Sequence, residues 1–425
     1  MDKNTSIITM VGASNYDTTT YKFPNGCQSK KTTIFSNALI EHYRDKLKTV
    51  VFLGTETSSW SSILPDSKNE EECNFLEMLQ SKERQNPRLP IVTEDFKKIE
   101  TILKKFYPEL EIYVLPLKSD ISLESRPLDV YSEIINYVKD SKIVLDITSA
   151  FRYVPLFIFE SLQTYSPNFD ANDITLLYAE KNERADVDYQ VRDISEVWRA
   201  AEINKALYSF QMTLDGSKLA RYLERAGETK LAEWVSTFSD YIQKSYIALC
   251  DYSFLKRLDN IVASKDIESI QVSFVKETYV FLRDKILSNF SYLKEISDIN
   301  RRSCCLYTFA SLLNAKKLYS QAFIALRESV VMRIIENYKP ELLKQKRINP
   351  DDLDDIGLYK YLNDHLEAYD KKVKEKWIVL KNTRNLSAHA GIELIYNMKN
   401  IEQSKEFDKY QEAVKEILEV VIKCK

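Results

Sequence analysis

The chain has very little glycine. Only seven glycines occur in 425 residues, whereas an average protein contains about 7%. None of them belongs to a G-x-G-x-x-G or Walker A loop, the backbone cradles that hold dinucleotides and nucleoside triphosphates. The sequence therefore argues against a dinucleotide-dependent enzyme and against an NTPase. Phosphates would instead meet hydroxyl and amide side chains and loop N–H groups.

Cysteine and histidine are scarce as well. The six cysteines show no C-x-x-C spacing, and only three histidines accompany them. This pattern disfavours both a zinc site and a disulfide framework. No cluster of acids or histidines with ligand spacing accompanies the candidate residues below. We therefore predict no metal and no resident cofactor.

Long apolar runs are missing too. None reaches the roughly 18 residues from which a membrane-spanning helix is inferred. The start M-D-K-N-T-S lacks the apolar core of a signal peptide, so we expect a cytoplasmic protein without membrane contact. A net charge of -3 argues against coating nucleic acid by bulk electrostatics. RNA would have to bind a local patch.

Proline divides the chain into two halves, because nine of the eleven prolines fall before residue 168. In the first half, short β-rich runs alternate with helical patterns, which predicts a Rossmann-like α/β domain with a parallel sheet. The predicted strands are 6–11, 49–53, 111–117, 142–147 and 174–178, and the predicted helices are 33–46, 94–106 and 155–165.

From about residue 195 onward, apolar residues recur at three- and four-residue spacing, which predicts an all-α part. The predicted helices are 197–213, 217–226, 231–255, 266–288 and 307–338. The charge-dense stretch 180–193 is the predicted hinge between the two halves.

Polar clusters follow three of the predicted strands, at 12–16, 54–58 and 148–152. Ligands of open α/β sheets bind at the carboxyl ends of strands. The third cluster belongs to the segment D-I-T-S-A-F-R-Y-V-P at 146–155, where Pro155 suits the first position of a helix. Free amides before that helix would attract an anion. The alternative is an ion pair between Asp146 and Arg152 that only fixes the turn.

The second candidate site is the segment K-N-T-R-N-L-S-A-H-A-G near the C-terminus. Arg384, Asn385 and His389 combine a fixed cation, an amide and a group that titrates near neutral pH. On one helix, residues five apart point about 140° away from each other, so Arg384 and His389 do not share a face. A two-fold dimer that brings two copies together would complete the constellation.

A basic stretch precedes this motif. Residues 371–384 contain six basic side chains and one acid. We predict that Lys376 and Lys381 hold an RNA backbone there, and the alternative is an ordinary solvated helix face.

Together these segments resemble the CARF–HEPN ribonucleases that accompany type III CRISPR systems. The resemblance rests on 10–16, 51–60 and 146–155 upstream, and on the R-N-x-x-x-H pattern of Arg384, Asn385 and His389 downstream. It implies a Rossmann-like CARF domain at 1–190, a helical connecting region at 191–295 and a helical HEPN domain at 296–425. Ser149 and Ala150 depart from the pattern of many relatives, which carry a larger polar residue and a glycine there.

The resemblance also implies an activator. A CARF domain binds a cyclic oligoadenylate, and cyclic tetraadenylate is the expected ring. By the resemblance and by their places at strand ends, the residues expected to contact it are Gly12, Ser14, Asn15, Thr55, Thr148, Ser149 and Arg152.

The implied reaction is metal-independent cleavage of single-stranded RNA by a homodimer. The ribose 2′-OH would attack the adjacent phosphate, leaving a 2′,3′-cyclic phosphate and a 5′-OH end. His389 would act as general acid or base or hold the phosphate, and Arg384 would stabilise the added negative charge. Asn385 would orient His389 or the phosphate.

Two other functions remain open at this point. In the first, the protein is a nucleotide-sensing regulator whose helical part binds a partner or DNA without cutting anything. In the second, it is a stand-alone, toxin-type ribonuclease whose sheet domain only dimerises. RNA cleavage in EDTA, with and without cyclic oligoadenylates, separates all three.

Overall fold

The computed structural model describes residues 3–14, 16–117, 127–148, 154–164, 173–181, 189–296 and 301–345, together with residue 412. The chain divides into two compact units, Met1–Glu202 and Ile203–Lys425. The predicted connecting region 191–295 therefore falls largely in the second unit, together with the described residues of 296–345.

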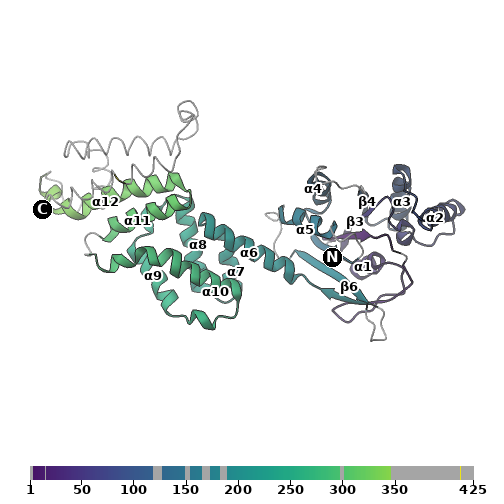
Figure 1. Ribbon diagram of the computed structural model, residues 1–425, viewed down its shortest axis with the longest axis horizontal. Coiled ribbons are helices and arrows are strands. Elements are labelled where there is room, and N and C mark those ends of the chain that lie inside the picture. Colours follow the sequence, from purple (N-terminus) through teal and green to yellow (C-terminus); the bar gives the residue numbers. More distant parts are fainter. Residues whose placement is uncertain are drawn as a thin grey trace, which may run out of the picture. The chain divides into compact units, whose positions relative to one another are not determined.

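The first unit is built on a seven-stranded sheet with the order β2-β7-β6-β5-β1-β3-β4 (Figure 1). Its strands are β1 Thr5–Val11, β2 Tyr21–Lys22, β3 Leu47–Thr55, β4 Glu111–Leu117, β5 Lys142–Asp146, β6 Ile174–Lys181 and β7 Tyr189–Asp193. The five strands predicted from the sequence are confirmed. Their β-branched and aromatic residues suit the buried, pleated surface of a sheet.

The sheet is mixed, not purely parallel as predicted. All strand pairs run parallel except β6 and β7, which pair antiparallel from Leu177↔Asp193 to Lys181↔Tyr189. The prediction of a hinge at 180–193 is wrong for the described residues at both ends of this stretch. Residues 180–181 belong to β6, and residues 189–193 form β7. Strand β7 is charge-rich because only Val191 of it is buried, so its other side chains can be polar.

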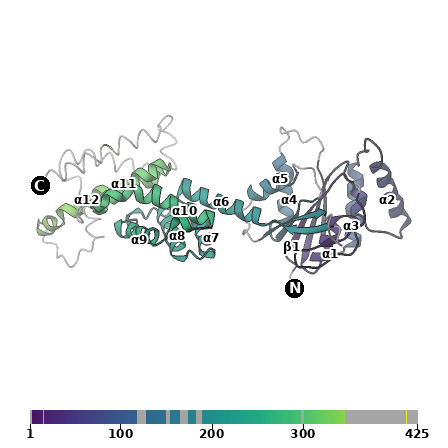
Figure 2. The same ribbon diagram turned by 60° about the horizontal axis from the view of Figure 1, so that its bottom comes forward.

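Helices cover both faces of the sheet. One core contains Ile7, Val50 and Phe52 with residues of α1 Phe35–Tyr43, α2 Glu70–Glu83 and α3 Thr93–Phe106. The other contains Ile8 and Val51 with residues of α4 Pro127–Val138 and α5 Val154–Thr164. Figure 2 shows α1 and α3 on one side of the strands and α4 and α5 on the other. Successive strand residues point to opposite faces, so both faces are apolar and the strands read as continuous apolar runs.

Two helices of this unit escaped the sequence prediction. Helix α2 has only Phe75 and Leu79 buried, which is too few for a clear apolar stripe. Its start carries a signal nevertheless, because the Asn69 side chain accepts a hydrogen bond from the N–H of Glu72 and three acids occupy the first turn. Helix α4 is the second one.

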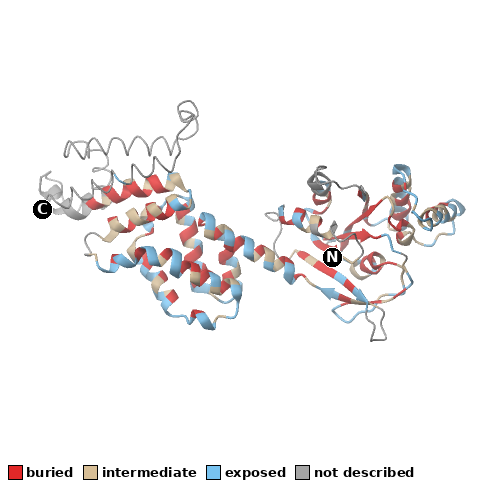
Figure 3. Ribbon diagram, in the orientation of Figure 1, coloured by how far each residue is buried: buried red, intermediate tan, exposed pale blue. Residues whose placement is uncertain are grey.

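The second unit is helical throughout its described residues, as predicted. Its elements, starting with the helix that contains the boundary, are α6 Glu196–Thr213, α7 Ser217–Arg225, α8 Thr229–Gln243, η3 Ile247–Leu249, α9 Tyr252–Ala263, η4 Ile267–Ser269, α10 Ser273–Phe281, η5 Leu282–Ile286, η6 Leu287–Lys294, α11 Arg301–Ala315 and α12 Tyr319–Gln345. Buried residues, coloured red in Figure 3, recur along these helices. At the centre, the Trp234 ring stacks on Phe238 and Phe254, with centroids 4.9 Å and 4.8 Å away.

The structure breaks three of the predicted helices. The expected helix 231–255 ends at Gln243, where Ser245 has φ 57° and the N–H of Tyr246 bonds the carbonyl of Tyr241. Asp251 then caps α9 by accepting from the N–H of Phe254. The expected helix 266–288 divides into η4, α10 and the π-helical η5.

The third break separates α11 from α12 inside the expected helix 307–338. Lys317 has φ 60°, and the N–H of Leu318 bonds the carbonyl of Leu313. Where a helix ends in a residue of left-handed conformation, that residue is usually glycine. Since this chain places serine and lysine there, the sequence carries no sign of the breaks.

The left-handed Lys317 gives a stability prediction. Lys317→Gly should raise the free energy of unfolding by up to about 1 kcal/mol, because glycine has no Cβ to clash in this conformation. Lys317→Ala removes the same exposed side chain but keeps the Cβ, so it serves as the control and should bring no gain. Urea denaturation of the three proteins measures the difference, and equal stabilities of the Gly and Ala variants would contradict the prediction.

Candidate functional site

The order of the strands reverses at β1. The chain passes from β1 outward to β3 and β4 on one side, and then to β5 and β6 on the other. Where the order of strands reverses, the loops diverge and leave room for a ligand. The loops after β1 and β5, which carry Gly12, Ser14 and Thr148, lie at this switch point. Because β1, β3 and β5 run parallel, the loop after β3 lies at the same edge, so the structure brings the described residues of all three predicted polar clusters together.

A buried hydrogen-bond network joins β1, β5 and β6 beneath these loops. The Thr9 hydroxyl donates to Oδ2 of Asp146 at 2.6 Å, and the N–H of Thr148 donates to Oδ1 at 2.8 Å. The N–H of Ala179 in β6 in turn donates to Oγ1 of Thr148 at 2.9 Å. Asp146 is 1% exposed. Burial raises the pKa of its carboxyl above the usual range, and the hydrogen bonds from Thr9 and Thr148 oppose this rise.

The Asp146 carboxylate therefore stabilises the turn after β5. An ion pair with Arg152 was the alternative considered for this turn, but Arg152 lies outside the described residues. The described partners already hold both carboxylate oxygens, so Asp146 fixes the start of the loop whatever Arg152 does.

The loop after β1 is held by a tyrosine. The hydroxyl of Tyr16 accepts a hydrogen bond from the N–H of Gly12 at 2.9 Å. Gly12 is buried, whereas the next two residues, Ala13 and Ser14, are exposed. The Ser14 side chain is thus available to a molecule that arrives at the edge.

The loop after β3 is tightly packed. A Cβ at Gly54 would come within 2.7 Å of Cζ2 of Trp60 and 3.0 Å of the Val11 carbonyl oxygen, so only glycine fits there. The buried indole of Trp60 donates to the Thr55 carbonyl at 2.7 Å. The Thr55 N–H donates to Oγ of Ser58 at 2.9 Å. Thr55 is itself 1% exposed, so its side chain belongs to the turn.

Ser59 ties the β1 and β3 loops together. Its N–H donates to the Gly12 carbonyl at 2.8 Å, and its hydroxyl donates to the Ser14 carbonyl at 2.7 Å. The Arg88 guanidinium donates to the same hydroxyl at 2.8 Å and to the Thr57 carbonyl at 3.3 Å. Ser59 therefore bonds the two loops directly to each other.

Sequence reasoning did not single out Tyr16, Ser59 or Arg88. Tyr16 stands in the polar cluster after β1, and Ser59 directly follows the cluster after β3, so their neighbourhood was a usable signal. Arg88 comes 29 residues after Ser59, and nothing in the sequence connects the two.

The remaining predicted site residues lie outside the described residues. These are Asn15, Ser149 and Arg152 of the ligand site, and Lys376, Lys381, Arg384, Asn385 and His389 of the ribonuclease site. Their roles stay predictions.

The described residues contain neither a candidate metal site nor a membrane-spanning helix. Among them, no three or more His, Cys, Asp or Glu side chains are grouped so that they could hold a metal ion. No helix among them combines the length and the apolar character needed to cross a membrane.

The Asp146 network gives a second stability prediction. Asp146→Ala should lower the free energy of unfolding by about 1–3 kcal/mol, because the Thr9 hydroxyl and the Thr148 N–H lose their acceptor. Asp146→Asn keeps an acceptor for Thr148 and places a donor toward the Thr9 oxygen, so it is the matched control.

The same pair predicts a pH dependence. A raised pKa means that the folded state favours the protonated carboxyl. The contribution of Asp146 to stability is therefore full below about pH 4, the pKa of the unfolded state. It is lost as the pH rises through the pKa of the folded state. The stability of Asp146→Asn relative to wild type should therefore increase with pH above about 4. Denaturation curves at several pH values measure this, and a constant difference would contradict it.

Comparison with known proteins identifies the first unit. Residues 6–183 match the model of the CARF domain of the CRISPR system endoribonuclease Csx1. The CRISPR-associated protein MJ1674 of Methanocaldococcus jannaschii is 24% identical over 400 residues, which cover 89% of this chain and 59% of that protein. The chain thus spans about three fifths of the relative's length.

Among solved structures, Csm6 of Enterococcus italicus bound to cyclic hexa-2'-fluoro-hexa-dAMP is similar at 11% sequence identity. The alignment covers 99% of this chain and 94% of that one, with a TM-score of 0.35. A score this low does not establish a common arrangement, so the assignment rests on the domain match and on the sequence relative. By these, residues 6–183 form a CARF domain, and the chain is similar over most of its length to a CRISPR-associated protein.

Proposed function

We propose that the protein is an endoribonuclease that a cyclic oligoadenylate activates. The observation that carries this proposal is the CARF match over 6–183, in which polar loops meet at the switch point of the sheet. The catalytic part of the proposal rests on the sequence motif of Arg384, Asn385 and His389. We expect it to act in the cytoplasm.

The activator would bind where two sheet edges meet in a homodimer. A cyclic oligoadenylate has rotational symmetry, so it can lie on a two-fold axis and touch the same loops of both subunits. Ser14, Asn15, Ser149 and Arg152 would supply hydroxyl, amide and guanidinium donors. Gly12, Thr55 and Thr148 would fix the path of the loops. Each of them makes a hydrogen bond that supports this role. The ring of four adenylates is the expected size.

Binding activates only if the ligand prefers one dimer geometry over another. The hydrogen bonds of Ser59 to both strand-end loops support such a preference, since a ligand that moves one loop also moves the other. The favoured geometry would align the two copies of Arg384 and His389.

The reaction would be a transesterification of single-stranded RNA without a metal. The 2′-oxygen attacks the phosphorus and gives up its proton to a base, while the bond to the 5′-oxygen breaks and that oxygen takes up a proton. The products are a 2′,3′-cyclic phosphate and a 5′-OH end. His389 moves a proton or holds the phosphate, Arg384 stabilises the charge, and Asn385 orients His389 or the phosphate. Lys376 and Lys381 hold the RNA backbone.

The catalytic assignment predicts that His389→Ala and Arg384→Ala lower activator-dependent RNA cleavage by roughly 10²-fold or more, as removal of a general acid–base or an oxyanion donor usually does. Cleavage of a labelled single-stranded RNA in EDTA measures this. His365→Ala is the matched control, because it also removes a histidine but one without catalytic partner residues near it in the sequence. This variant should cleave RNA at the wild-type rate. The assignment fails if both motif variants keep more than about a tenth of the activity, or if cleavage requires Mg²⁺ or Mn²⁺.

The sensor assignment predicts that Ser149→Trp abolishes both binding of cyclic tetraadenylate and its stimulation of cleavage, because the indole would fill the ligand's place at the strand end. Calorimetry and the cleavage assay measure the two effects, and sedimentation checks that the dimer persists. Ser81→Trp, at an exposed position of α2, is the control. Wild-type affinity in Ser149→Trp would show that the loop after β5 is only a structural turn.

A further inference from the structure

The connection between α2 and α3, residues 84–92, lies against the loop after β3. The N–H of Ile91 donates to the Glu56 carbonyl at 2.9 Å, and the Arg88 guanidinium donates to the Thr57 carbonyl at 3.3 Å. Both acceptors directly follow β3, at the edge where the loops after β1 and β5 also lie. The α2–α3 connection is therefore a further segment in contact with the strand-end loops.

This connection is fixed at both of its ends. The Lys82 amine pairs with the Asp95 carboxylate at 2.9 Å, and only 24% and 14% of these two side chains are exposed. The same carboxylate accepts a hydrogen bond from the N–H of Val92 at 3.2 Å, and the N–H of Leu89 donates to the Lys82 carbonyl at 3.2 Å. A pair that is shielded from water is screened less by salt than an exposed pair. Arg88 therefore approaches the β3 loop from a firm base.

Arg88 also determines how the Ser59 hydroxyl is used. The guanidinium donates to this hydroxyl at 2.8 Å, and the hydroxyl donates its one proton to the Ser14 carbonyl at 2.7 Å. Ser59 is 3% exposed, so water does not compete for these bonds. A charged donor polarises the hydroxyl that it binds and strengthens the bond that this hydroxyl makes in turn. The loop after β1, with its exposed Ser14, thus depends on Arg88 through Ser59.

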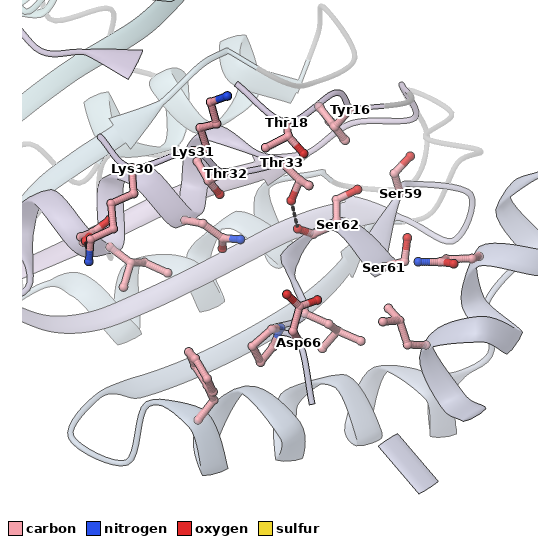
Figure 4. A pocket seen from close by; sticks show the side chains of 18 of the residues that line it. Tyr16, Thr18, Lys30, Lys31, Thr32, Thr33, Ser59, Ser61, Ser62 and Asp66 are labelled. Carbon is pink, nitrogen blue, oxygen red and sulfur yellow. Dashed lines mark hydrogen bonds and ion pairs between the residues drawn. The ribbon is translucent and has the colours of Figure 1, made fainter. Parts of the chain in front are cut away.

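The charge of Arg88 already faces a carboxylate. Ser59 and Ser61 line a groove of about 800 Å³ between α1 and α2 (Figure 4), and so does Glu83 at the end of α2. The Glu83 carboxylate accepts from the N–H and the hydroxyl of Ser61 at 2.9 Å and 2.6 Å. Burial raises the pKa of Glu83, and the bonds from Ser61 and the charge of Arg88 oppose this rise. A guanidinium beside a carboxylate is poorly placed to bind a ligand phosphate, so its role lies in holding the loops.

We propose that Arg88 is a positioning residue of the cyclic oligoadenylate site. Acting through Ser59, it holds the loop after β1 in the conformation that binds the ligand and does not itself touch the ligand. This inference rests on the proposed function, because it concerns the same strand-end site. A ligand that needs one loop conformation binds more weakly in proportion as that conformation becomes less populated. Loss of Arg88 therefore lowers the affinity for the ligand.

Calorimetric titration of the full-length protein with cyclic tetraadenylate tests this role. Arg88→Ala should weaken binding by about five- to tenfold, as a fall of the competent loop population to about 10–20% would do. Arg88→Lys should bind within about twofold of wild type, since an ammonium can donate to both the Ser59 hydroxyl and the Thr57 carbonyl, as one guanidinium nitrogen does.

The matched control is Arg84→Ala, which removes an arginine from the same connection. Among the described residues, Arg84 reaches the Gln80 side chain at 3.5 Å and bonds neither strand-end loop. This variant should bind cyclic tetraadenylate as tightly as wild type does. Thermal melts check that all variants fold.

A double-mutant cycle separates positioning from a general loss of structure. Ser59→Ala removes the group through which Arg88 reaches the Ser14 loop. When Ser59→Ala is already present, Arg88→Ala should therefore weaken binding by no more than about twofold. Hydrogen exchange gives a second readout that needs no ligand, because the peptide that contains Ser14 should exchange faster in Arg88→Ala than in wild type or in Arg84→Ala.

The positioning role is overturned if Arg88→Ala binds cyclic tetraadenylate as tightly as wild type, or if Arg88→Lys is as weak as Arg88→Ala. It is also overturned if the effects of Arg88→Ala and Ser59→Ala multiply in full, or if the Ser14 peptide exchanges equally in Arg88→Ala and wild type. A wild-type protein that binds no cyclic tetraadenylate would instead refute the sensor assignment. The exchange measurement would then still decide whether Arg88 holds the loop after β1.

Discussion

The carboxylate of Asp146 is the constraint on which the loops at the carboxyl ends of β1 and β5 depend. It lies buried at the reversal of strand order and accepts hydrogen bonds from Thr9 in β1 and from the Thr148 N–H after β5. Thr148 then holds β6 through Ala179. A buried carboxylate is costly unless such donors surround it, so the three strands and the loop that leaves β5 must keep their relative positions. The loop that the CARF resemblance marks as a ligand contact therefore starts from a rigid base.

The β1 and β3 loops obey a related constraint. Gly54 allows the buried Trp60 ring to approach the backbone, and the indole in turn fixes the turn through the Thr55 carbonyl. Ser59 then connects this turn to the loop after β1. Rigid strands thus carry mutually bonded loops, which is an arrangement suited to passing a ligand's preference from one loop to the next. It also explains why Thr55, Ser58 and Ser59 are buried although they are polar, since they hold the loops.

The scarcity of glycine shapes the second unit and limits what its sequence reveals. Ser245 and Lys317 occupy left-handed positions where glycine usually ends a helix. Tertiary packing imposes these conformations, since the hydrogen bonds that close each helix end are formed at some cost in local strain. A prediction based on periodicity therefore joined α8 with the start of α9, and α11 with α12, into single helices, and it left residues 256–263 of α9 outside the predicted helices.

The sequence by itself determined the alternation of strands and helices, the apolar strands of a doubly covered sheet and the helical character of the second unit. These follow from local periodicity and propensity, which act between residues close in the chain. It also located the loops after β1, β3 and β5 at one edge, because the carboxyl ends of parallel strands meet there. Only the tertiary structure decided the antiparallel β7, the turn-bound role of Thr55, the bonds of Tyr16 and Arg88, and the groove between α1 and α2. Each depends on contacts between residues far apart in sequence, such as Arg88 with Ser59 or Glu83 with Ser61, and such contacts form only when the whole sheet and its helices have packed.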